Sequence, residues 1–442
     1  MVREINSGGF GIVHEVLNRD GNRYARKTFR LNASISADDE TVRKAKARFA
    51  REMRIQSQIR HSHVMPILHA ELDAEPPWFL MPLADEDYTA QIDRDKKNAK
   101  ISLEPLLGIL AGLEELHRLG YVHRDLKPHN VLSLAGTWVI SDLGLVLPTA
   151  RDTTVITSVL SAWGTQNYAA PELVRDFRNA PTQSDIYSFG CLLHDIVGSR
   201  ARVPYARVTE AGPVGAIIER CTEEDPSQRF PNISALRSAL VTAIAAPVLV
   251  IDAPQVQAWV DLLRDTPETV DLTIWEEIIR FIERTFESDD AIALLQVMDM
   301  VQLEILSKKS PSLFQRFVPF LSKWIKTGKF NFDYCDVLAG RLVYVYEVGD
   351  IREKAESAVA MLNMGYFHNR YFVMRHFVKM AGPEIDDDLA DRLAIEMFTE
   401  GKDALRKFAA IEGAIKVGRE SLHTKIQNAL QVIGNEIVNE PH

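Results

Sequence analysis

The ten residues from Tyr121 to Asn130, YVHRDLKPHN, constrain this chain more than any other stretch. A histidine, an arginine, an aspartate, a lysine and an asparagine follow one another there, directly after an apolar helical pattern. So many polar and charged groups cannot all be buried without partners, and an ordinary surface loop rarely needs this mixture. Two interpretations are open. The stretch is either a solvated turn with incidental charges, or a site that handles negative groups and metal ions.

Length and composition limit the alternatives. With 442 residues, of which 46% are hydrophobic and 25% charged, the chain is typical of a soluble globular protein, and about two to four domains are expected. The formal net charge of −10 argues against a broad nucleic-acid-binding surface, so no nucleic-acid partner is expected. Cys191, Cys221 and Cys335 are odd in number and far apart, which predicts neither a disulfide framework nor a metal site and favours a reducing compartment.

Two stretches bear on targeting and membrane insertion. The start, MVREINSGGFG, lacks the basic and then apolar pattern of a signal peptide. The most apolar run, ALVTAIAAPVLVI at 239–251, is too short to span a bilayer and contains Pro247. We interpret it as a buried helix end followed by a crossing between domains. The sequence therefore predicts no membrane span and a cytoplasmic location.

The first half of the chain reads as a β-rich lobe followed by a helical lobe. Short β-rich runs separated by RDGN predict a meander over residues 2–30, and a helical pattern follows from Asp38 to Arg60. VMPILHAEL and WFLMPL are strand-like, whereas most segments beyond Ser102 are helical, apart from short pieces such as WVISDLG. We expect lobes at about 1–84 and 85–246.

The second half, residues 252–442, is helix after helix. Its periodic segments include PQVQAWVDLLRD, TIWEEIIRFIERTF, DAIALLQVMDMVQLEIL and SLFQRFVPFLSKWIK. Because no clear repeat period is present, an irregular helical domain or a degenerate α-solenoid is expected rather than a regular array. HNRYFVMRHF, with His368 and His376, is better explained as an amphipathic helix with a basic face than as a metal or nucleic-acid site. EIDDDLADRL is typical of a helix N-terminus.

Three features upstream of residue 121 are weak when each is taken alone. Glycines 8, 9 and 11 in NSGGFGIV allow a tight turn that brings amide N–H groups toward phosphate oxygens, although such clusters are more often simple hairpin turns. Lys27 in YARK lies at an internal strand position, where a lysine usually extends to solvent. Glu52, on the following helix, can pair with Lys27 or simply belong to a solvated face.

The stretch at 121–130 can be interpreted together with one further acidic residue downstream. Asp125 can accept a proton from an attacking hydroxyl, and Lys127 can stabilise charge on a transferred phosphoryl group. Asn130 offers an amide oxygen, and Asp142 in VISDLG offers a carboxylate. Oxygen ligands together with nucleotide phosphates are how Mg²⁺ is usually held. A solvated turn does not explain this ordered set together with the glycine loop, the strand lysine and the helix glutamate.

From about residue 2 to residue 245 the chain resembles the eukaryotic-like Ser/Thr protein kinase superfamily. The motifs that carry the resemblance are NSGGFGIV, YARK, HRDLKPHN, DLG, GTQNYAAPE, SDIYSFG and DPSQRF, in this order. The residue types at Lys127 and Thr165 resemble those of the Ser/Thr branch of the family and not those of the tyrosine branch. The implied fold is the α+β bilobal protein kinase fold, here followed by an all-α domain of no recognised family.

The resemblance assigns roles to individual positions. The implied catalytic residues are Asp125 as base, Lys127, Lys27 on the α- and β-phosphates, and Glu52, which orients Lys27. The implied ligands of Mg²⁺, with Mn²⁺ as an alternative ion, are Asn130 and Asp142. The implied ATP-binding residues are Asn6, Gly8, Gly9, Gly11 and Val13 in the glycine loop, Lys27, the hinge residues Met81, Pro82 and Ala84, and Ala25 and Leu132, which with Val13 would enclose the adenine. The implied structural residues are Glu172, paired with Arg229, and Asp185, which braces the catalytic loop.

The resemblance also implies a mode of regulation. In kinases with an arginine at the position of Arg124, a phosphate on the activation segment commonly orders that segment. The hydroxyls offered here are Thr153, Thr154, Thr157, Ser158 and Ser161, of which Ser161 aligns best with the usual site, and Thr165 follows. We expect autophosphorylation on this segment.

Three departures from the family pattern refine these expectations. Asn6 replaces the first loop glycine, and asparagine tolerates positive φ better than most residues, so the cover over the nucleotide should survive. Leu143 replaces the usual phenylalanine and keeps an apolar side chain. The segment between Glu172 and Arg229 is short, which predicts that the part of the lobe that often docks substrates is trimmed.

Three classes of function remain. The leading one is transfer of the γ-phosphoryl group of ATP to Ser/Thr hydroxyls of unnamed protein substrates. A pseudokinase scaffold would normally have lost Lys27, Asp125 or Asp142, and all three are present. A small-molecule phosphotransferase of related fold generally lacks the APE segment and the HRDLKPxN form. For residues 252–442 we expect a sensing, substrate-recruiting or autoinhibitory module with a regulatory partner, on fold analogy alone.

Overall fold

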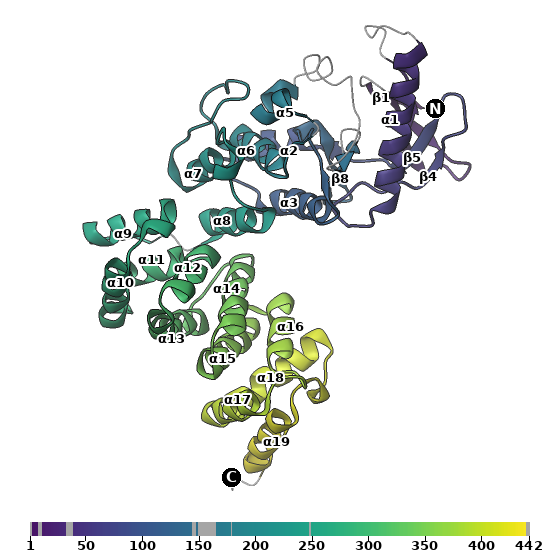
Figure 1. Ribbon diagram of the computed structural model, residues 1–442. Coiled ribbons are helices and arrows are strands. Elements are labelled where there is room, and N and C mark those ends of the chain that lie inside the picture. The colour runs from purple at the N-terminus through teal and green to yellow at the C-terminus, as the bar shows by residue number, and fades with distance from the viewer. Residues whose placement is uncertain are drawn as a thin grey trace. The chain divides into compact units, whose positions relative to one another are not determined.

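The computed structural model divides the chain into two units, Met1–Ile244 and Ala245–His442. It describes residues 2–7, 11–31, 39–143, 147–148, 165–177, 179–246 and 249–438. In Figure 1 the strands occur in the purple to teal part of the chain, and the described part of the second unit consists of helices and their connections. Within the described residues, no helix combines the length and the apolar character needed to cross a membrane.

The first unit begins with an antiparallel sheet in the order β1-β2-β3-β5-β4. Its strands are β1 (Arg3–Ser7), β2 (Gly11–Leu17), β3 (Arg23–Phe29), β4 (His69–Glu71) and β5 (Trp78–Pro82). Asn18 shapes the turn between β2 and β3, because its Oδ1 accepts the N–H groups of Asp20 and Asn22, both at 2.9 Å. Gly21 completes this turn with φ +83°, which suits a residue without a Cβ. The resulting register places Lys27 opposite Val13 on one side and Phe79 on the other.

Helix α1 (Asp39–Gln58) packs on this sheet through aromatic contacts. The ring of Phe49 lies 5.9 Å from that of Phe29 and 5.2 Å from that of Phe79, measured between centroids. Glu52 follows Phe49 by three positions and therefore lies on nearly the same helix face. The packing of Phe49 thus directs a carboxylate toward β3.

The rest of the first unit is mainly helical. Its elements are β6 (Glu86–Asp87), α2 (Tyr88–Asn98), α3 (Leu103–Arg118), β7 (Tyr121–Val122), η1 (Pro128–Asn130), β8 (Val131–Leu134), β9 (Thr137–Ile140), β10 (Leu147–Pro148), η3 (Thr165–Asn167), α5 (Pro171–Arg175), α6 (Gln183–Val197), α7 (Gly212–Cys221), η4 (Pro226–Gln228) and α8 (Ile233–Ala245). Buried aliphatic residues of α3 and α6, among them Leu110 and Leu192, form the centre of its core.

Two glycines let α3 approach the loop that precedes β4. A Cβ at Gly112 would lie 2.5 Å from the carbonyl oxygen of His63, and one at Gly108 would lie 3.0 Å from His63 Nδ1. His63 O in turn accepts the N–H of Ile140 at 3.0 Å. The close approach therefore fixes β9, and with it the segment that leads to Asp142.

The predicted β-rich lobe followed by a helical lobe is confirmed, but one strand was predicted too long. VMPILHAEL forms a strand only over His69–Glu71. Val64 makes an isolated parallel bridge to Ile140, and the N–H of Met65 donates to Ile140 O at 2.9 Å. Pro66 then has no N–H to donate, so the chain cannot extend this pairing into β4.

The second unit is all-helical, as predicted. Its elements are α9 (Pro254–Asp265), η5 (Pro267–Thr269), α10 (Leu272–Thr285), α11 (Asp289–Val297), α12 (Met300–Lys309), α13 (Pro311–Thr327), α14 (Tyr334–Val348), α15 (Ile351–His368), α16 (Tyr371–Met380), α17 (Asp387–Glu400), α18 (Lys402–Ile415), η6 (Arg419–Ser421) and α19 (Thr424–Val438). Helix α15 contacts α13, α14, α16, α17 and α18. All of these helices lie within three places of α15 in the sequence, so the contacts fit both an irregular helical domain and a degenerate α-solenoid, in which each repeat contacts its neighbours.

The prediction of one helix over DAIALLQVMDMVQLEIL was wrong. The stretch forms α11 and α12, because Asp299 starts a new helix: its side chain accepts the N–H of Val301, and its own N–H donates to Gln302 Oε1 at 3.1 Å. The buried guanidinium of Arg341 donates to the carbonyl oxygens of Leu295 (3.3 Å) and Gln296 (3.1 Å), which closes the end of α11.

HNRYFVMRHF is also not a single helix. His368 is the last residue of α15, Asn369 follows in the left-handed conformation with φ +47°, and α16 starts at Tyr371. His376 packs edge-to-face on Phe372, with 4.6 Å between ring centroids. Among the described residues no group of three or more His, Cys, Asp or Glu side chains is placed to hold a metal ion. The helix start predicted in EIDDDLADRL is confirmed, with Asp386 accepting the N–H of Leu389 at 2.9 Å.

Candidate active site

Lys27 stands at the centre of the candidate site. Its Nζ lies 2.6 Å from Oε1 of Glu52, which comes from α1, and 3.0 Å from Oδ1 of Asp142, which follows β9. Gly11 allows this position of the lysine, since a Cβ there would lie 3.4 Å from Lys27 Cε and 3.3 Å from Thr28 O. Sheet, helix and second lobe therefore each contribute one of the three charged groups.

The two carboxylates control the charge of Lys27. Burial alone would lower its pKa, but the negative charges of Asp142 and Glu52 outweigh burial and raise the pKa above its ordinary value. The lysine is therefore a fixed cation at neutral pH. Such a cation, partly enclosed and held on two sides, is suited to bind phosphate oxygens.

The catalytic-loop stretch is held by one buried acid, Asp185 of α6. Its carboxylate accepts the N–H groups of His123 (2.9 Å) and Arg124 (2.8 Å) and contacts Nε2 of His117 at 2.7 Å. Burial would raise the pKa of Asp185, but the hydrogen bond and charge of His117, followed by His123 and the backbone of Arg124, hold it below the ordinary value. This fixes Arg124 with φ +65°, a conformation that is uncommon outside glycine.

Asp125 is close enough to feel the charge of Asp142 and is held by two neighbours. Lys127 Nζ lies 3.1 Å and 2.9 Å from its two oxygens, and Asn130 Nδ2 donates to its Oδ2 at 3.1 Å and to its carbonyl oxygen at 2.7 Å. Burial raises the pKa of Asp125, Lys127 opposes this change, and the nearby Asp142 charge adds to it. The net pKa is above the ordinary value, which makes the carboxylate a better proton acceptor.

Asn130 and Asp142 offer the oxygen atoms that a magnesium site needs. The amide nitrogen of Asn130 is used on Asp125, and no hydrogen bond within the described chain uses its Oδ1. Asp142 is 45% exposed and has φ +61°, so its carboxylate faces an accessible space although one oxygen contacts Lys27. Asn130 O accepts the N–H of Ser141 at 2.8 Å. Because Ser141 directly precedes Asp142, this hydrogen bond holds the backbone of Asp142 close to Asn130. Two oxygen donors fit Mg²⁺, which takes few protein ligands and completes its shell with water and phosphate.

The residues predicted to surround adenine share one apolar cluster. Ala25 and Met81 are buried in it, and Val13 and Leu132 pack against it. Ala25 pairs with Met81 across β3 and β5, and Tyr24 pairs with Pro82. Ala84 lies in the connection that follows β5.

Some predicted positions need correction or lie outside the described residues. Asn6 is part of β1 and pairs with Val13, so its backbone is extended and the positive φ considered for it is not used. Gly8, Gly9, Thr153, Thr154, Thr157, Ser158 and Ser161 lie outside the described residues. The backbone of Thr165 belongs to η3. Arg124 itself is buried, with its guanidinium 5.5 Å from the ring centroid of Phe177.

Glu172 and Arg229 form a buried two-point ion pair. Arg229 Nη1 and Nη2 lie 2.6 Å and 2.8 Å from the two carboxylate oxygens. Ser184 donates to Glu172 Oε1 at 2.7 Å, and Arg229 Nε donates to Glu223 O at 2.8 Å. The end of the AAPE segment is thereby fixed to the start of α6.

Sequence reasoning missed two supporting groups. His117, near the end of α3, completes the contacts of Asp185, and only its place one turn from the loop could have indicated it. Tyr168 donates its hydroxyl to Asp195 at 2.6 Å, and Arg202 lies 2.5 Å from the other oxygen of that acid. No motif joins these three residues in the sequence.

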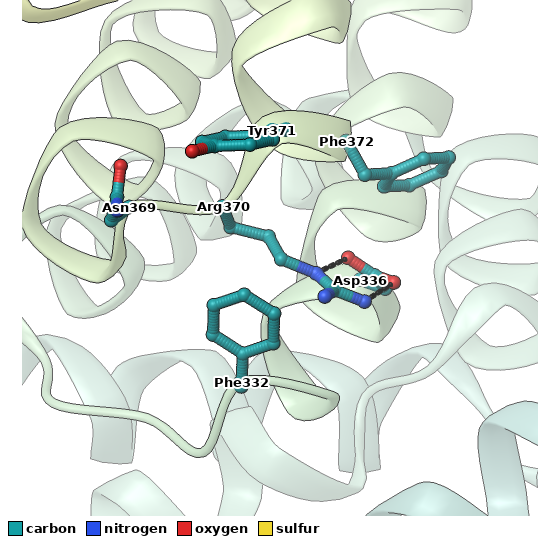
Figure 2. Close-up of a pocket in the computed structure, with 6 residues that line it drawn as sticks. All are labelled: Phe332, Asp336, Asn369, Arg370, Tyr371 and Phe372. Carbon is teal, nitrogen blue, oxygen red and sulfur yellow. Dashed lines mark hydrogen bonds and ion pairs between the residues drawn. The ribbon is translucent and has the colours of Figure 1, made fainter. Parts of the chain in front are cut away.

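The second unit has a pocket of its own, of about 520 Å³ (Figure 2). Arg370 donates to both oxygens of Asp336, at 2.8 Å and 2.5 Å, and its guanidinium lies 4.1 Å from the ring centroid of Phe332. Tyr371 and Phe372 complete the wall and, like Phe332, expose about half of their surface. Exposed aromatic side chains gathered at one pocket are typical of binding surfaces.

With this geometry in place, the comparison with known families decides the assignment of the chain. The family described as the protein kinase domain matches residues 1–298, which is more than half of the sequence. The chain belongs to the protein kinase family. The match continues past Ile244 into the helices that begin the second unit. The protein kinase fold expected for the first unit is thus confirmed.

Named relatives agree with this kinase assignment. Serine/threonine-protein kinase PknL of Mycobacterium bovis is 27% identical over 279 residues, covering 57% of this kinase and 68% of PknL. Serine/threonine-protein kinase AfsK of Streptomyces griseus is 30% identical over 230 residues, or 52% of this kinase and 27% of AfsK. Probable serine/threonine-protein kinase PknB of Bifidobacterium longum is 28% identical over 309 residues, or 60% and 43%. This kinase therefore spans less than half of the length of AfsK and PknB.

Proposed function

We propose that the chain transfers the γ-phosphoryl group of ATP to serine and threonine hydroxyls of proteins. The observation that carries the proposal is the convergence of Lys27, Glu52 and Asp142 within 3.0 Å contacts, next to a loop that holds Asp125. Family membership and the names of the relatives support the same reaction class. The ion pairs of Lys27 with Glu52 and Asp142 also argue against a pseudokinase scaffold that has lost its catalytic groups.

Each charged residue has its own role in the proposed transfer. Lys27 binds phosphate oxygens of ATP, while Glu52 holds the lysine in place. Asp125 accepts the proton of the acceptor hydroxyl while the hydroxyl oxygen forms a bond to the γ-phosphorus. The bond between the γ-phosphorus and the β–γ bridging oxygen breaks at the same time, and ADP leaves. Lys127, on the carboxylate of Asp125, stabilises negative charge on the transferred group.

The metal requirement follows from the oxygen donors at the site. Mg²⁺, or Mn²⁺ in its place, neutralises charge on the phosphates when bound. Asn130 Oδ1 and the exposed carboxylate of Asp142 are the residues that would hold it. The apolar cluster of Val13, Ala25 and Leu132 supports a place for adenine beside Met81 and Pro82.

Two regulatory features belong to the same proposal. The chain phosphorylates its own activation segment, with Ser161 as the preferred site and Arg124 as the cation that pairs with the phosphate. The helical unit binds a regulatory or substrate partner, and the aromatic pocket at Phe332 and Tyr371 supports this role. Intact-mass analysis after incubation with Mg-ATP tests the first feature, and an active enzyme that gains no phosphate would reject it.

Transfer of radiolabel from γ-labelled ATP tests the reaction and separates it from its alternatives. Wild type should label protein on serine and threonine, and Asp125→Asn should not. A pseudokinase scaffold would give no label with either chain. A small-molecule phosphotransferase would consume ATP only with a small hydroxyl acceptor and would leave protein unlabelled.

A further inference from the structure

A second polar cavity lies in the helical lobe of the first unit, away from Lys27. It measures about 230 Å³, and its polar lining is Lys96, Asn167, His194, Asp195, Arg200 and Arg202. Lys96 comes from the last turn of α2, His194 and Asp195 from the last turn of α6, and the two arginines from the segment that follows α6. Asn167 ends η3, directly before Tyr168. The cavity therefore borders the chain that leads into AAPE.

Among the described residues that line this cavity, Asp195 is the one carboxylate, and it is already neutralised. Arg202 Nη1 lies 2.5 Å from Asp195 Oδ1, and the Tyr168 hydroxyl donates to Oδ2 at 2.6 Å. Arg202 is almost fully buried, donates also to Cys191 O at 2.9 Å and lies 5.0 Å from the centroid of the Tyr168 ring. These contacts hold Arg202 and Asp195 as a fixed pair that adds no net charge.

The histidine of the cavity is also accounted for. Its Nδ1 accepts from Arg202 at 3.1 Å, and its Nε2 lies 3.2 Å from Oε1 of Glu210. Burial and the charge of Arg202 lower the pKa of His194, although Glu210 opposes them. Glu210 is in turn bound by the N–H of Ser199 at 2.9 Å and does not line the cavity. At neutral pH, His194 therefore contributes no positive charge.

Two cations remain without a counter-charge. Lys96 and Arg200 are both exposed, and within the part of the chain that the structure describes neither forms a salt bridge or a side-chain hydrogen bond. Both line the same small cavity, where two like charges repel each other unless an anion lies between them. The cavity thus has the charge and the donor groups to bind a carboxylate or a phosphate group.

The cavity also lies within reach of a bound protein substrate. Asp185, which holds the catalytic loop, and Asp195, which lines the cavity, are 10 positions apart on α6 (195 − 185), or about 15 Å along the helix. An extended peptide advances about 3.3–3.6 Å per residue, so a segment of only a few residues spans a distance of that order. Tyr168 O accepts from Ser188 at 2.8 Å, so the rim near Asn167 is fixed to the same helix.

We propose that the cavity between Lys96 and Arg200 binds an acidic side chain of the protein substrate, a few residues from the hydroxyl that receives the phosphate. This proposal rests on the proposed kinase function and names its substrate class: serine and threonine sites accompanied by a carboxylate or a second phosphate. The cavity does not touch Lys27, Asp125, Asn130 or Asp142, so it selects substrates without taking part in the transfer.

Peptide phosphorylation by the full-length chain tests the proposal. Serine peptides carry glutamate, phosphoserine, glutamine or lysine at one position, moved from six residues before the acceptor to six after it. Wild type should phosphorylate the glutamate peptide with a kcat/KM about fivefold or more above that of the glutamine peptide, at one of the positions in the scan. Phosphoserine in place of glutamate shows whether the site prefers a phosphate.

Variants of the two cations supply the controls. Lys96→Ala and Arg200→Ala should each lower the ratio of kcat/KM for the glutamate peptide to kcat/KM for the glutamine peptide toward one, and should leave kcat/KM for the glutamine peptide unchanged. Arg200→Glu should reverse the preference, so that the lysine peptide is favoured. Lys97→Ala is the matched control, since Lys97 is an exposed neighbour on α2 that does not line the cavity. Equal rates for all four peptides, or equal losses with Lys97→Ala, would overturn the proposal.

A binding measurement keeps the test independent of catalysis. The glutamate peptide with alanine in place of its serine is labelled, and its fluorescence anisotropy is followed with wild type and Arg200→Glu. Binding should weaken at least fivefold in the variant, and unchanged affinity would contradict the site. Absence of phosphorylation of every peptide and of the chain itself, with this binding difference intact, would instead count against the proposed kinase reaction.

Discussion

Lys27 and Asp142 are 115 positions apart in the sequence, and their side chains lie 3.0 Å apart in the structure. Lys27 belongs to the sheet of the first lobe, whereas Asp142 follows β9, which pairs with β8 of the second lobe. Their contact therefore joins the two lobes at the place where a nucleotide triphosphate would bind. Glu52 reinforces it from α1, so that three separate elements have to be correctly placed for the charges to meet.

Replacement of Lys27 by methionine should strongly reduce catalysis while the fold is kept. The change removes the cation proposed to bind phosphate and leaves Glu52 and Asp142 to repel each other. We expect kcat/KM for ATP to fall by about 100-fold or more, as is typical when one charge-stabilising group is lost. Steady-state kinetics and circular dichroism check this result, and activity within a few-fold of wild type would contradict the role of Lys27.

The acid limb of the pH–rate profile should depend on Lys127. Asp125 acts as a base only when deprotonated, so kcat/KM should rise with pH through its pKa, which burial raises and the charge of Lys127 holds down. Lys127→Ala removes that charge, and the limb should move to higher pH, with a loss of about 100-fold in kcat at neutral pH. A limb that stays in place or moves to lower pH would show that the rate does not report Asp125.

Asp185→Asn should weaken the catalytic loop in a pH-dependent way. Burial would raise the pKa of Asp185, but His117 and the loop N–H groups hold it below its ordinary value. A lowered folded-state pKa gives stability that is present above the unfolded value of about 3.8 and is lost as pH falls toward the folded value. We expect a loss of roughly 3 kcal/mol at pH 7.

Hydrogen exchange of the amides of His123 and Arg124 measures this loss. Wild type should lose protection as the pH is lowered below about 3.8, once intrinsic exchange rates are taken into account, whereas the variant should already lack it at neutral pH. Equal protection in both proteins at pH 7 would show that the carboxylate does not hold the loop.

Arg229→Met should destabilise the first unit strongly, since it removes the buried guanidinium and leaves the largely enclosed carboxylate of Glu172 without its two-point partner. Breaking a buried ion pair typically costs roughly 3–5 kcal/mol. Arg175→Met is the matched control, because Arg175 is an exposed arginine on α5 close to Glu172 in sequence and should change the free energy of unfolding by less than about 0.5 kcal/mol. Urea unfolding followed by circular dichroism gives both values, and equal effects would contradict the role assigned to the pair.

Asp299→Ala should destabilise the start of α12 by about 1 kcal/mol, the usual cost of losing an N-cap side chain. Asp299→Asn is the control, because asparagine caps equally well and should restore most of the stability. Hydrogen exchange of the amides from Val301 to Leu303 reports the local effect. If alanine instead protects these amides more strongly, residues 289–309 would favour one continuous helix.

The order of elements and most of the site could be predicted from the sequence because short motifs fix local geometry. HRDLKPHN places Asp125, Lys127 and Asn130 within six positions, so their contacts follow from one loop. The periods of the strand and the helix left two options for Glu52, and the resemblance to protein kinases implied its pairing with Lys27. The hydrogen bond at 2.6 Å agrees with that implication.

Contacts between elements that are distant in the sequence could not be predicted where no motif joins them. His117 reaches Asp185 only because the end of α3 lies next to the start of α6, and Arg202 reaches Asp195 only because the segment after α6 folds back. The break between α11 and α12 depends on Asp299 as a cap and on Arg341, which comes from a third helix. An apolar period that continues across residues 290–306 conceals such a break.

The binding of ATP, measured by calorimetry with and without Mg²⁺, tests the central claim most directly, since it separates metal-assisted nucleotide binding from chemistry. The account predicts Mg²⁺-dependent binding for wild type and for Asp125→Asn, the latter without phosphoryl transfer, and binding at least tenfold weaker for Asp142→Asn in the presence of Mg²⁺. Binding that is equally tight in all three proteins, with no dependence on Mg²⁺, would contradict a nucleotide site at Lys27, Asn130 and Asp142.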